Sequence, residues 1–310
     1  MNLLNKVIIV IIFTVAVYSI FVITSDITTI SEKISNIEIE FFIIIGIFVT
    51  LGWFILFARW HLLLKNSNIS IPIKSSFLVY ISGFALSMIP GEAGDLIKIQ
   101  ILKNKFNVSR SKTSGIIFSE WLYTAIGLIS LSLTGVIFFE LGGQIAIIFL
   151  ILLISLISLI KSKKLFFKFS KLVSKIKYLS KFTKNIEESY NVIQESTKGK
   201  IAIISILLSL SFWVLESILV YFIINKFGIN QVEMFELISM YASAIILGFI
   251  SFLPLGTGVV EISLASFLNQ KGVELSISFS IIIVIRLLTR WYPVMIGFIV
   301  IKKMMSQYNK

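Results

Sequence analysis

Two short stretches decide the fold: IPGEAGD at residues 89–95 and PLGTGVVE at residues 254–261. Each combines Pro and Gly with an acid inside otherwise apolar sequence, and each follows a Gly-Phe pair, Gly83-Phe84 or Gly248-Phe249. Helix breakers at membrane depth expose backbone groups that lipid cannot hydrogen-bond, so they persist only where they are buried in protein or line a watery cavity. Two such breaks in corresponding halves of one chain predict a binding site between the internal repeats of a transporter-like protein.

The composition around these stretches is that of a polytopic membrane protein. The chain has 310 residues, of which 57% are hydrophobic and 14% are charged, and its mean hydropathy is +0.97. The absence of cysteine excludes disulfides and thiolate chemistry, and a single histidine, His61, argues against a His-rich metal centre or a Ser-His-Asp triad. We expect no cofactor. The net charge of +12 indicates basic loops facing anionic lipid rather than a nucleic-acid partner.

The hydropathy predicts an all-α fold with six full transmembrane helices, each needing about 20 residues. The first is interpreted as a retained span because no small-residue cleavage site follows it. Two further apolar segments, 77–102 and 235–269, are interrupted by the breaker stretches. The six expected spans cover residues 7–24, 41–58, 113–139, 144–160, 201–225 and 277–301.

The loop charges predict the orientation of these segments. Both ends of segment 77–102 are flanked by basic residues, which predicts a re-entrant hairpin that enters from the cytoplasm. Segment 235–269 is predicted to begin and end outside, because the last span must end inside, before Lys302 and Lys303. The result is an inverted-topology repeat in the cytoplasmic membrane with both termini cytoplasmic. The alternative is that 237–253 is an ordinary span followed by a polar loop.

The chain divides into two membrane halves, 1–160 and 201–310, joined by a basic linker at 161–200. Within the linker, apolar residues recur at helical spacing between Lys161 and Lys184, with lysines on the other side. This pattern predicts an amphipathic helix on the anionic inner leaflet, either as a lipid-sensing element or simply as a connecting helix. Its apolar residues are Leu165, Phe169, Leu172, Ile176 and Leu179.

Ionisable residues in the predicted spans are candidate site residues, because each costs about 2.5–3.5 kcal/mol on insertion scales. Glu120 follows Pro90 by 30 residues and Arg286 follows Pro254 by 32. If the halves are related by symmetry, these two occupy similar places, which predicts a Glu120–Arg286 ion pair across the repeat interface. The alternative is that the buried charges pair only for structure. The other such charges are Glu92, Asp95, Glu216, Glu261 and Arg290.

The glycines and prolines of the breaker stretches are interpreted as hinges at which a ligand can approach the backbone. The helix that restarts after each break presents its N-terminus, which favours an anionic group such as phosphate. The acids at the same places favour a cationic headgroup or a coupling proton, so both kinds of ligand stay open. The hinge residues are Pro90, Gly91, Gly94, Pro254, Gly256 and Gly258.

These residues resemble the transmembrane, flippase-like region of lysylphosphatidylglycerol synthases, a family that also includes stand-alone membrane proteins and archaeal proteins linked to surface glycosylation. The resemblance covers about residues 5–303 and rests on Gly83–Asp95 with Lys98, on Glu120, on the Pro254-x-Gly256-x-Gly258-x-x-Glu261 signature and on Arg286. Many relatives carry arginine directly after the acid at position 120, where this chain has Trp121. The soluble aminoacyl-transferase domain of the synthases is absent from this sequence, so their aminoacylation activity is not implied.

The resemblance implies movement of a membrane lipid or a polyprenyl-phosphate-linked headgroup through a polar cavity between the repeats. We expect Arg286 to balance the cavity acids or to contact a phosphate. No nucleotide-binding motif is present, so energy would come from an ion gradient, a partner or downhill movement. The alternatives are an anchor for a separate synthase or glycosyltransferase and an integral-membrane transferase that uses a hairpin acid as general base. The expected cavity acids are Glu92, Asp95, Glu120, Glu216 and Glu261.

Overall fold

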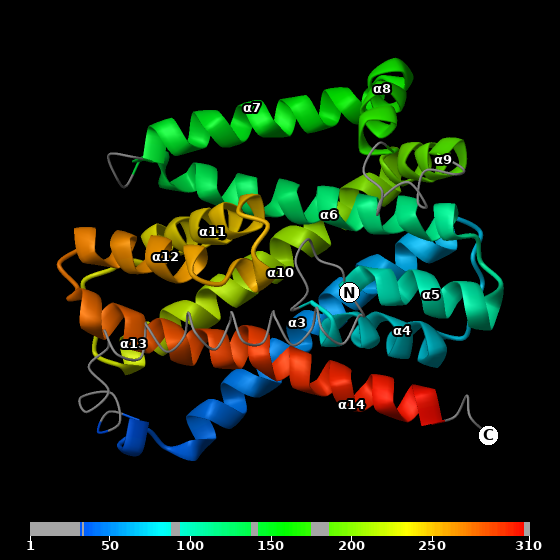
Figure 1. Ribbon diagram of the computed structural model, residues 1–310. Helices are drawn as coiled ribbons and strands as arrows, with labels where there is room; N and C mark the ends of the chain where they lie inside the picture. The colour runs from blue at the N-terminus through cyan, green and yellow to red at the C-terminus, as the bar shows by residue number, and fades with distance from the viewer. Residues whose placement is uncertain (1–31, 33, 88–93, 138–141, 175–185, 307–310) are drawn as a thin grey trace.

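The computed structural model describes residues 32, 34–87, 94–137, 142–174 and 186–306, and every regular element in these ranges is helical (Figure 1). The elements are α3 (Ile39–Asn66), α4 (Ile73–Ala85), α5 (Gly94–Phe106), α6 (Arg110–Leu133), η1 (Thr134–Ile137), α7 (Gly142–Lys161), α8 (Lys163–Ser174), α9 (Ile186–Ser196), α10 (Gly199–Lys226), α11 (Met234–Ile250), η3 (Pro254–Gly256), α12 (Val259–Gln270), α13 (Leu275–Arg286), the π-helical turn η4 (Leu287–Trp291) and α14 (Tyr292–Ser306).

The prediction of an all-helical polytopic membrane protein is confirmed. Four apolar helices of the described chain are long enough to cross a bilayer: α3, α6, α10 and the continuous stretch from Leu275 to Met304. They correspond to the expected spans 41–58, 113–139, 201–225 and 277–301. Helix α7 corresponds to the span expected at 144–160 and is apolar but shorter. The span expected at 7–24 lies outside the described residues.

Both breaker stretches divide their segments into two short helices that pack on each other, α4 on α5 and α11 on α12. We call these pairs hairpin 1 and hairpin 2. A helix of 13 residues, the length of α4 and of α5, is about 20 Å long, less than the roughly 30 Å of a hydrocarbon core. The two hairpins occupy opposite halves of the bundle (Figure 1). Pro90, Gly91 and Glu92 lie outside the described residues.

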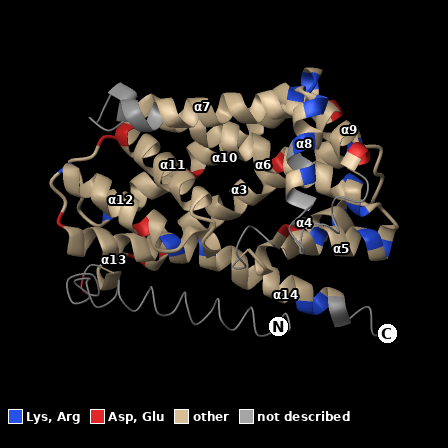
Figure 2. Cartoon of the chain, turned by 45° about the horizontal axis from the view of Figure 1, so that its top comes forward, with Lys and Arg blue, Asp and Glu red and all other residues tan. Residues whose placement is uncertain are grey.

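The charges of the chain ends and turns are segregated along the bundle (Figure 2). Lysines and arginines gather at the end that carries hairpin 1, α8 and the C-terminal turns of α14, which we call the lysine-rich end. Acids flank the opposite end, where Glu38, Glu233 and Glu274 precede α3, α11 and α13. Which end faces the cytoplasm stays a prediction, as does the position of both termini.

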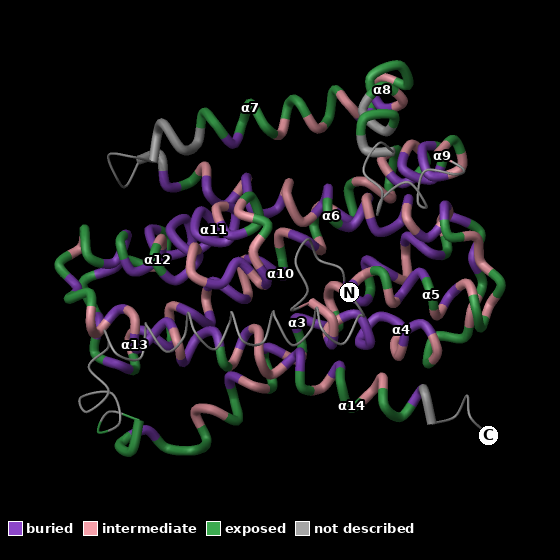
Figure 3. Tube along the Cα trace, viewed as in Figure 1, coloured by how far each residue is buried: buried purple, intermediate pink, exposed green. Residues whose placement is uncertain are grey.

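The burial pattern separates a lipid-exposed belt from a packed interior (Figure 3). Large apolar side chains are exposed along α7, with Ile147 at 60% and Ile151 at 57%, and along the first half of α3. Helix α11 is buried over most of its length between α6, α10 and α12. Exposed isoleucine and leucine at this density suit acyl chains rather than water.

The packing of the two halves follows one pattern. Helix α3 packs on α10. Hairpin 1 packs through α4 on α14, and hairpin 2 packs through α11 on α6, so each hairpin lies against a long helix of the opposite half. Gly297 of α14 allows the first contact, because a Cβ there would overlap the backbone of Phe84 and Ala85.

The described part of the linker holds two helices, α8 within the segment predicted to be amphipathic and α9 after that segment. In α8 the side chains of Leu165 and Leu172 are exposed, as an interfacial helix requires, while Phe166 packs on Tyr190 of α9. Ile176 and Leu179 lie outside the described residues. Helix α9 lies along α6, and the prediction of a continuous connecting segment up to residue 200 missed this packing. The division into two halves and a linker itself stays a prediction.

Candidate functional site

Lys98 of α5 is the centre of a first group of buried charges. Its ammonium nitrogen lies 2.7 Å from Asp95 Oδ1 and 3.1 Å from Glu120 Oε2. Asp95 and Lys98 are three residues apart in α5 and therefore share a face, and Glu120 reaches them from α6. Lys98 and Glu120 are 5% and 4% exposed. Lys98 is therefore ion-paired with two acids at once.

Arg59 of α3 supplies the second base of this group. Its guanidinium lies 3.9 Å from Glu120 and donates hydrogen bonds to Ser209 of α10 and Thr124 of α6. Arg59 directly follows the span expected at 41–58, but α3 continues to Asn66 and Arg59 is 3% exposed. Two acids and two bases make the group neutral, as burial of charge requires.

Aromatic side chains enclose the Lys98 ammonium. It lies 4.7 Å from the ring centroid of Trp60 and 5.1 Å from that of Tyr80, within cation–π range. Trp121 donates its indole N–H to Asp95 Oδ2 at 2.8 Å, so the residue that departs from the family pattern is part of this group. Gly83 makes room for the lysine stem, since a Cβ there would overlap Lys98 Cε.

Glu261 of α12, in hairpin 2, and Arg286 of α13 form a second group that is closed to the surface. Their side chains are 2.8 Å apart and each is 1% exposed. The other Glu261 oxygen accepts the Gly258 N–H at 2.6 Å, which caps α12, and Arg286 donates to the carbonyl of Leu255. Leu255, Gly256 and Gly258 all have positive φ, so Arg286 holds a turn that an ordinary helix cannot make.

The predicted Glu120–Arg286 ion pair is wrong. Glu120 pairs with Lys98 and Arg59, and Arg286 pairs with Glu261. Each of the two finds its partners within its own half: Glu120 in hairpin helix α5 and in α3, and Arg286 in hairpin helix α12. The Lys98–Glu120 and Glu261–Arg286 pairs do join corresponding elements, the second hairpin helix and the long helix that follows it, with the charges exchanged.

Glu216 and Arg290 form a third group. The Arg290 guanidinium binds both carboxylate oxygens, at 2.6 and 3.0 Å, and Tyr241 of α11 donates to the same carboxylate at 2.7 Å. Arg290 lies in the π-helical turn η4 and over the ring of Trp213, at 5.8 Å from its centroid. Extra residues in such turns often re-aim a functional side chain.

Helix α10 connects the first and third groups. Ser209, Trp213 and Glu216 follow at intervals of four and three and therefore share one face of the helix. Ser209 accepts from Arg59, whereas Trp213 and Glu216 contact Arg290. The side chains of Asp95 and Arg290, at 15% and 17% exposed, are the most accessible of the paired acids and bases in these three groups.

Comparison with known proteins identifies the family of this chain. Residues 7–297 match the family described as lysylphosphatidylglycerol synthase TM region. The chain belongs to this family. It is also similar to a UPF0104 membrane protein of Methanocaldococcus jannaschii, at 29% identity over 69% of this chain and 91% of that protein. A UPF0104 membrane protein of Pyrococcus horikoshii is 24% identical over 86% of this chain and 88% of its own length.

In this family member, the buried acids pair with more bases than the sequence analysis had named as site residues. The expected cavity acids within the described residues are all paired with a base, and all of them except the partly exposed Asp95 are buried. Glu92 lies outside the described residues. Arg59, Lys98 and Tyr241 were not among the candidate site residues, and Arg290 was named only as a charge within a span. The signal that could have found them is charge balance, because several buried acids require a matching number of buried bases.

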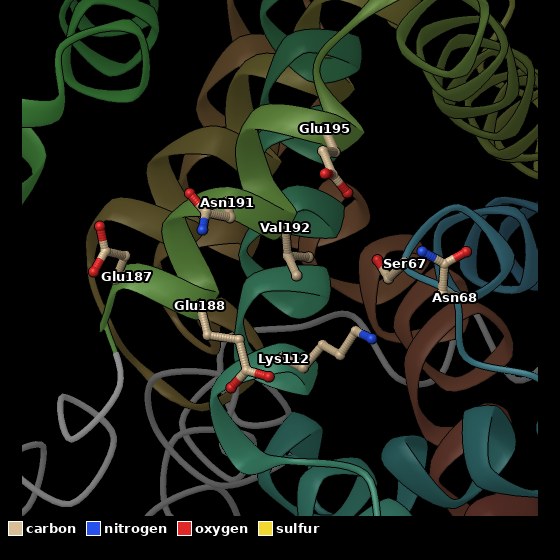
Figure 4. Close-up of a pocket in the computed structure, with 8 residues that line it drawn as sticks. All are labelled: Ser67, Asn68, Lys112, Glu187, Glu188, Asn191, Val192 and Glu195. Carbon is tan, nitrogen blue, oxygen red and sulfur yellow. The ribbon is translucent and has the colours of Figure 1, made fainter.

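Among the described residues, no group of three or more His, Cys, Asp or Glu could hold a metal ion. A polar pocket of about 530 Å³ lies at the lysine-rich end, away from the three charge groups (Figure 4). The charge groups themselves are packed rather than open. Transport through them would therefore require the ion pairs to separate.

Proposed function

We propose that the chain is a lipid flippase-like transporter of the cytoplasmic membrane, which moves the headgroup of a lipid or a polyprenyl-phosphate-linked molecule between two inverted repeats. Membership of the family supports a membrane role. The observation that carries the proposal is the set of neutral charge groups inside the bundle, the first of which is joined to the other half by the hydrogen bond from Arg59 of α3 to Ser209 of α10. Charge inside a membrane bundle is costly and marks substrate or ion pathways in many transporters.

The packing pattern supports the inverted repeat. In this topology α3 and α10 correspond, hairpin 1 corresponds to hairpin 2, and α6 corresponds to the stretch from α13 to α14. The contacts α4–α14 and α11–α6 are then equivalent. The hairpins, too short to span, would enter from opposite faces with their breaks near mid-membrane, as in transporters with discontinuous helices. With α7 and the span expected at 7–24, this arrangement has six full spans.

The proposed mechanism is an exchange of ionic partners. A phosphate that approaches Arg290 competes with Glu216 for the guanidinium, and an ammonium that approaches Asp95 competes with Lys98. Because each group is neutral, binding of an anion alone leaves an unpaired buried acid, which is strongly unfavourable. A headgroup with both charges, or an anionic headgroup moving with a proton, avoids this cost. Asp95 and Arg290 are the proposed first contacts because they are the most accessible.

The linker would hold the protein against anionic lipid. In α8 the lysines share the helix with the exposed Leu165 and Leu172. Apolar side chains inserted among acyl chains and lysines at the headgroups are the features of an interfacial helix. Each lysine near an anionic surface contributes about 1 kcal/mol.

The test is headgroup translocation in liposomes that contain the purified chain. A fluorescent phospholipid, an aminoacyl lipid and a polyprenyl-phosphate lipid are compared in the wild type and in Asp95→Asn and Arg290→Gln. We expect protein-dependent movement of one lipid, slowed about 10-fold or more in each variant, which corresponds to about 1.4 kcal/mol. Lys74→Gln, an exposed change on α4 outside the charge groups and outside α8, is the control and should leave the rate unchanged.

If both variants move lipid at the wild-type rate, the charge groups are not part of the transport pathway. No movement of any of the three lipids contradicts the transport proposal and favours the anchoring of a separate synthase or glycosyltransferase. Size-exclusion profiles of the variants distinguish loss of transport from loss of fold.

A further inference from the structure

The pocket at the lysine-rich end has a polar lining drawn from three parts of the chain (Figure 4). It lies between α9, the turn after α3 and the first turn of α6. A second pocket of about 340 Å³ adjoins it and shares Asn68, Lys112 and Glu188, so the two form one groove. The lining residues of the first pocket are Ser67, Asn68, Lys112, Glu187, Glu188, Asn191, Val192 and Glu195.

One wall of the groove is the acidic face of α9. Glu188, Asn191 and Glu195 lie at intervals of three and four residues and therefore share this face. Glu188 is held by the hydroxyl of Ser109, which donates to its carboxylate at 2.7 Å. Glu187 is already paired with Lys163 at 2.8 Å, and this hydrogen bond keeps the pKa of Glu187 below its usual range.

The α9 wall is fixed in place by its packing on α6. Ser189 donates to the carbonyl of Ser111 at 2.6 Å, and Tyr123 donates to the carbonyl of Ser196 at 2.6 Å. Gly115 lies so close to α9 that a Cβ there would overlap Ser189 and Val192. The spacing of the acids is therefore set before any ligand arrives, which favours specific binding.

The opposite wall carries a cation and hydrogen-bonding groups. Lys112 extends across the groove toward Ser67 and Asn68 (Figure 4), and its ammonium has no carboxylate partner among the described residues. Ser67 is 2% exposed, and its hydroxyl, which points toward α9, has no hydrogen-bond partner in the described part of the chain. Buried hydroxyls normally have partners, so this group is available to a ligand.

We propose that this groove binds a small phosphoamine, with the ammonium at Glu188 and Glu195 and the phosphate at Lys112, Ser67 and Asn68. A simple cation would be repelled by Lys112, and a simple anion would be repelled by the glutamates. A divalent metal is disfavoured because the acids do not converge on one point among the described residues. Only a molecule with both charges satisfies both walls. The proposal does not depend on the transport function proposed above.

The phosphoamine could be free in solution or the headgroup of a lipid. Isothermal titration of the full chain in detergent therefore uses phosphoethanolamine in one arm and short-chain phosphatidylethanolamine in the other. We expect saturable binding in at least one arm, weakened about 10-fold or more by Lys112→Gln and by Glu195→Gln. Ser67→Ala should weaken it less, since only one hydrogen bond is lost. Binding in the first arm identifies a free ligand, and binding in the second arm alone identifies a lipid.

Charge-matched controls are Lys74→Gln on α4 and Glu40→Gln at the opposite end, both exposed and outside the groove. They should leave the affinity unchanged. The proposal is overturned if the controls weaken binding as much as the groove variants do. It is also overturned if ethylamine or inorganic phosphate binds as tightly as phosphoethanolamine, or if neither arm shows saturable binding at millimolar concentration.

Discussion

The two hairpins are built on the same plan and carry opposite charges. In each, a glycine before the break packs against a glycine after it, Gly83 with Gly94 and Gly248 with Gly256. Hairpin 1 places a base, Lys98, against an acid on the next long helix, and hairpin 2 places an acid, Glu261, against a base. The glycine contacts of the backbone are the same in both hairpins, but the charges of the paired side chains are opposite.

The two hairpins differ in how far their charged side chains are exposed, and this suggests a structural role for one group and contact with a ligand for the other. The Glu261–Arg286 pair caps α12 and holds the carbonyl of Leu255, and both of its side chains are 1% exposed. In hairpin 1, Asp95 is 15% exposed and its second oxygen binds Trp121 at the surface. The ion pair of hairpin 2 is therefore buried and stabilises the turn before α12. In hairpin 1, one member of the charge group, Asp95, is partly exposed.

The largest expected effect compares the loss of the base from the ion pair that each hairpin makes, Lys98 in one and Arg286 in the other. Arg286→Met leaves Glu261 buried without a charge partner and should destabilise the protein by about 3–5 kcal/mol. Lys98→Met should cost less, because Arg59 remains beside Glu120 and Asp95 is partly exposed. Unfolding in detergent, followed by tryptophan fluorescence, measures both. The comparison fails if Lys98→Met is the more damaging change.

A smaller loss of stability is expected when the glycines that pack across each hairpin are replaced by alanine. In Gly94→Ala the new Cβ would meet backbone atoms of Gly83 and Ser87, which cannot move independently. In Gly248→Ala the nearest atom is a methyl group of Val260, which a side-chain rotation can displace. We expect Gly94→Ala to cost about 1–3 kcal/mol and Gly248→Ala less.

Gly46→Ala is the control for these substitutions, because nothing lies within 4 Å of its Cβ position. It should leave the midpoint of unfolding unchanged or raise it slightly, since alanine favours the helix. Equal losses at Gly94 and Gly248 would show that the two hairpins tolerate repacking to the same degree.

The smallest effect concerns the surface of hairpin 1. Trp121→Phe keeps an aromatic ring but removes the N–H that donates to Asp95, and should cost about 0.5–1.5 kcal/mol. If Asp95 is a first contact of the headgroup, the rate of lipid movement should change more than the stability does. A loss of stability with an unchanged rate would assign Trp121 to structure alone.

The sequence by itself determined the membrane class, four of the long helices, the two helix breaks and the identity of the buried acids. These follow from local properties: about 20 apolar residues make a span, Pro and Gly interrupt a helix, and a charge in a span is costly wherever it lies. The packed helix α9 was missed because its apolar side chains form only a short face, whose partner α6 is distant in the sequence.

Only the tertiary structure decided which charges pair. Symmetry of position suggested Glu120 with Arg286, but the hairpins bring Lys98 to Glu120 and Glu261 to Arg286. Arg59 fell just outside the span expected at 41–58 because helix length is set by packing against α10, which hydropathy does not encode. A buried charge can be recognised from its own neighbours in the chain, but its partner depends on which helices meet. That is a property of the packed bundle.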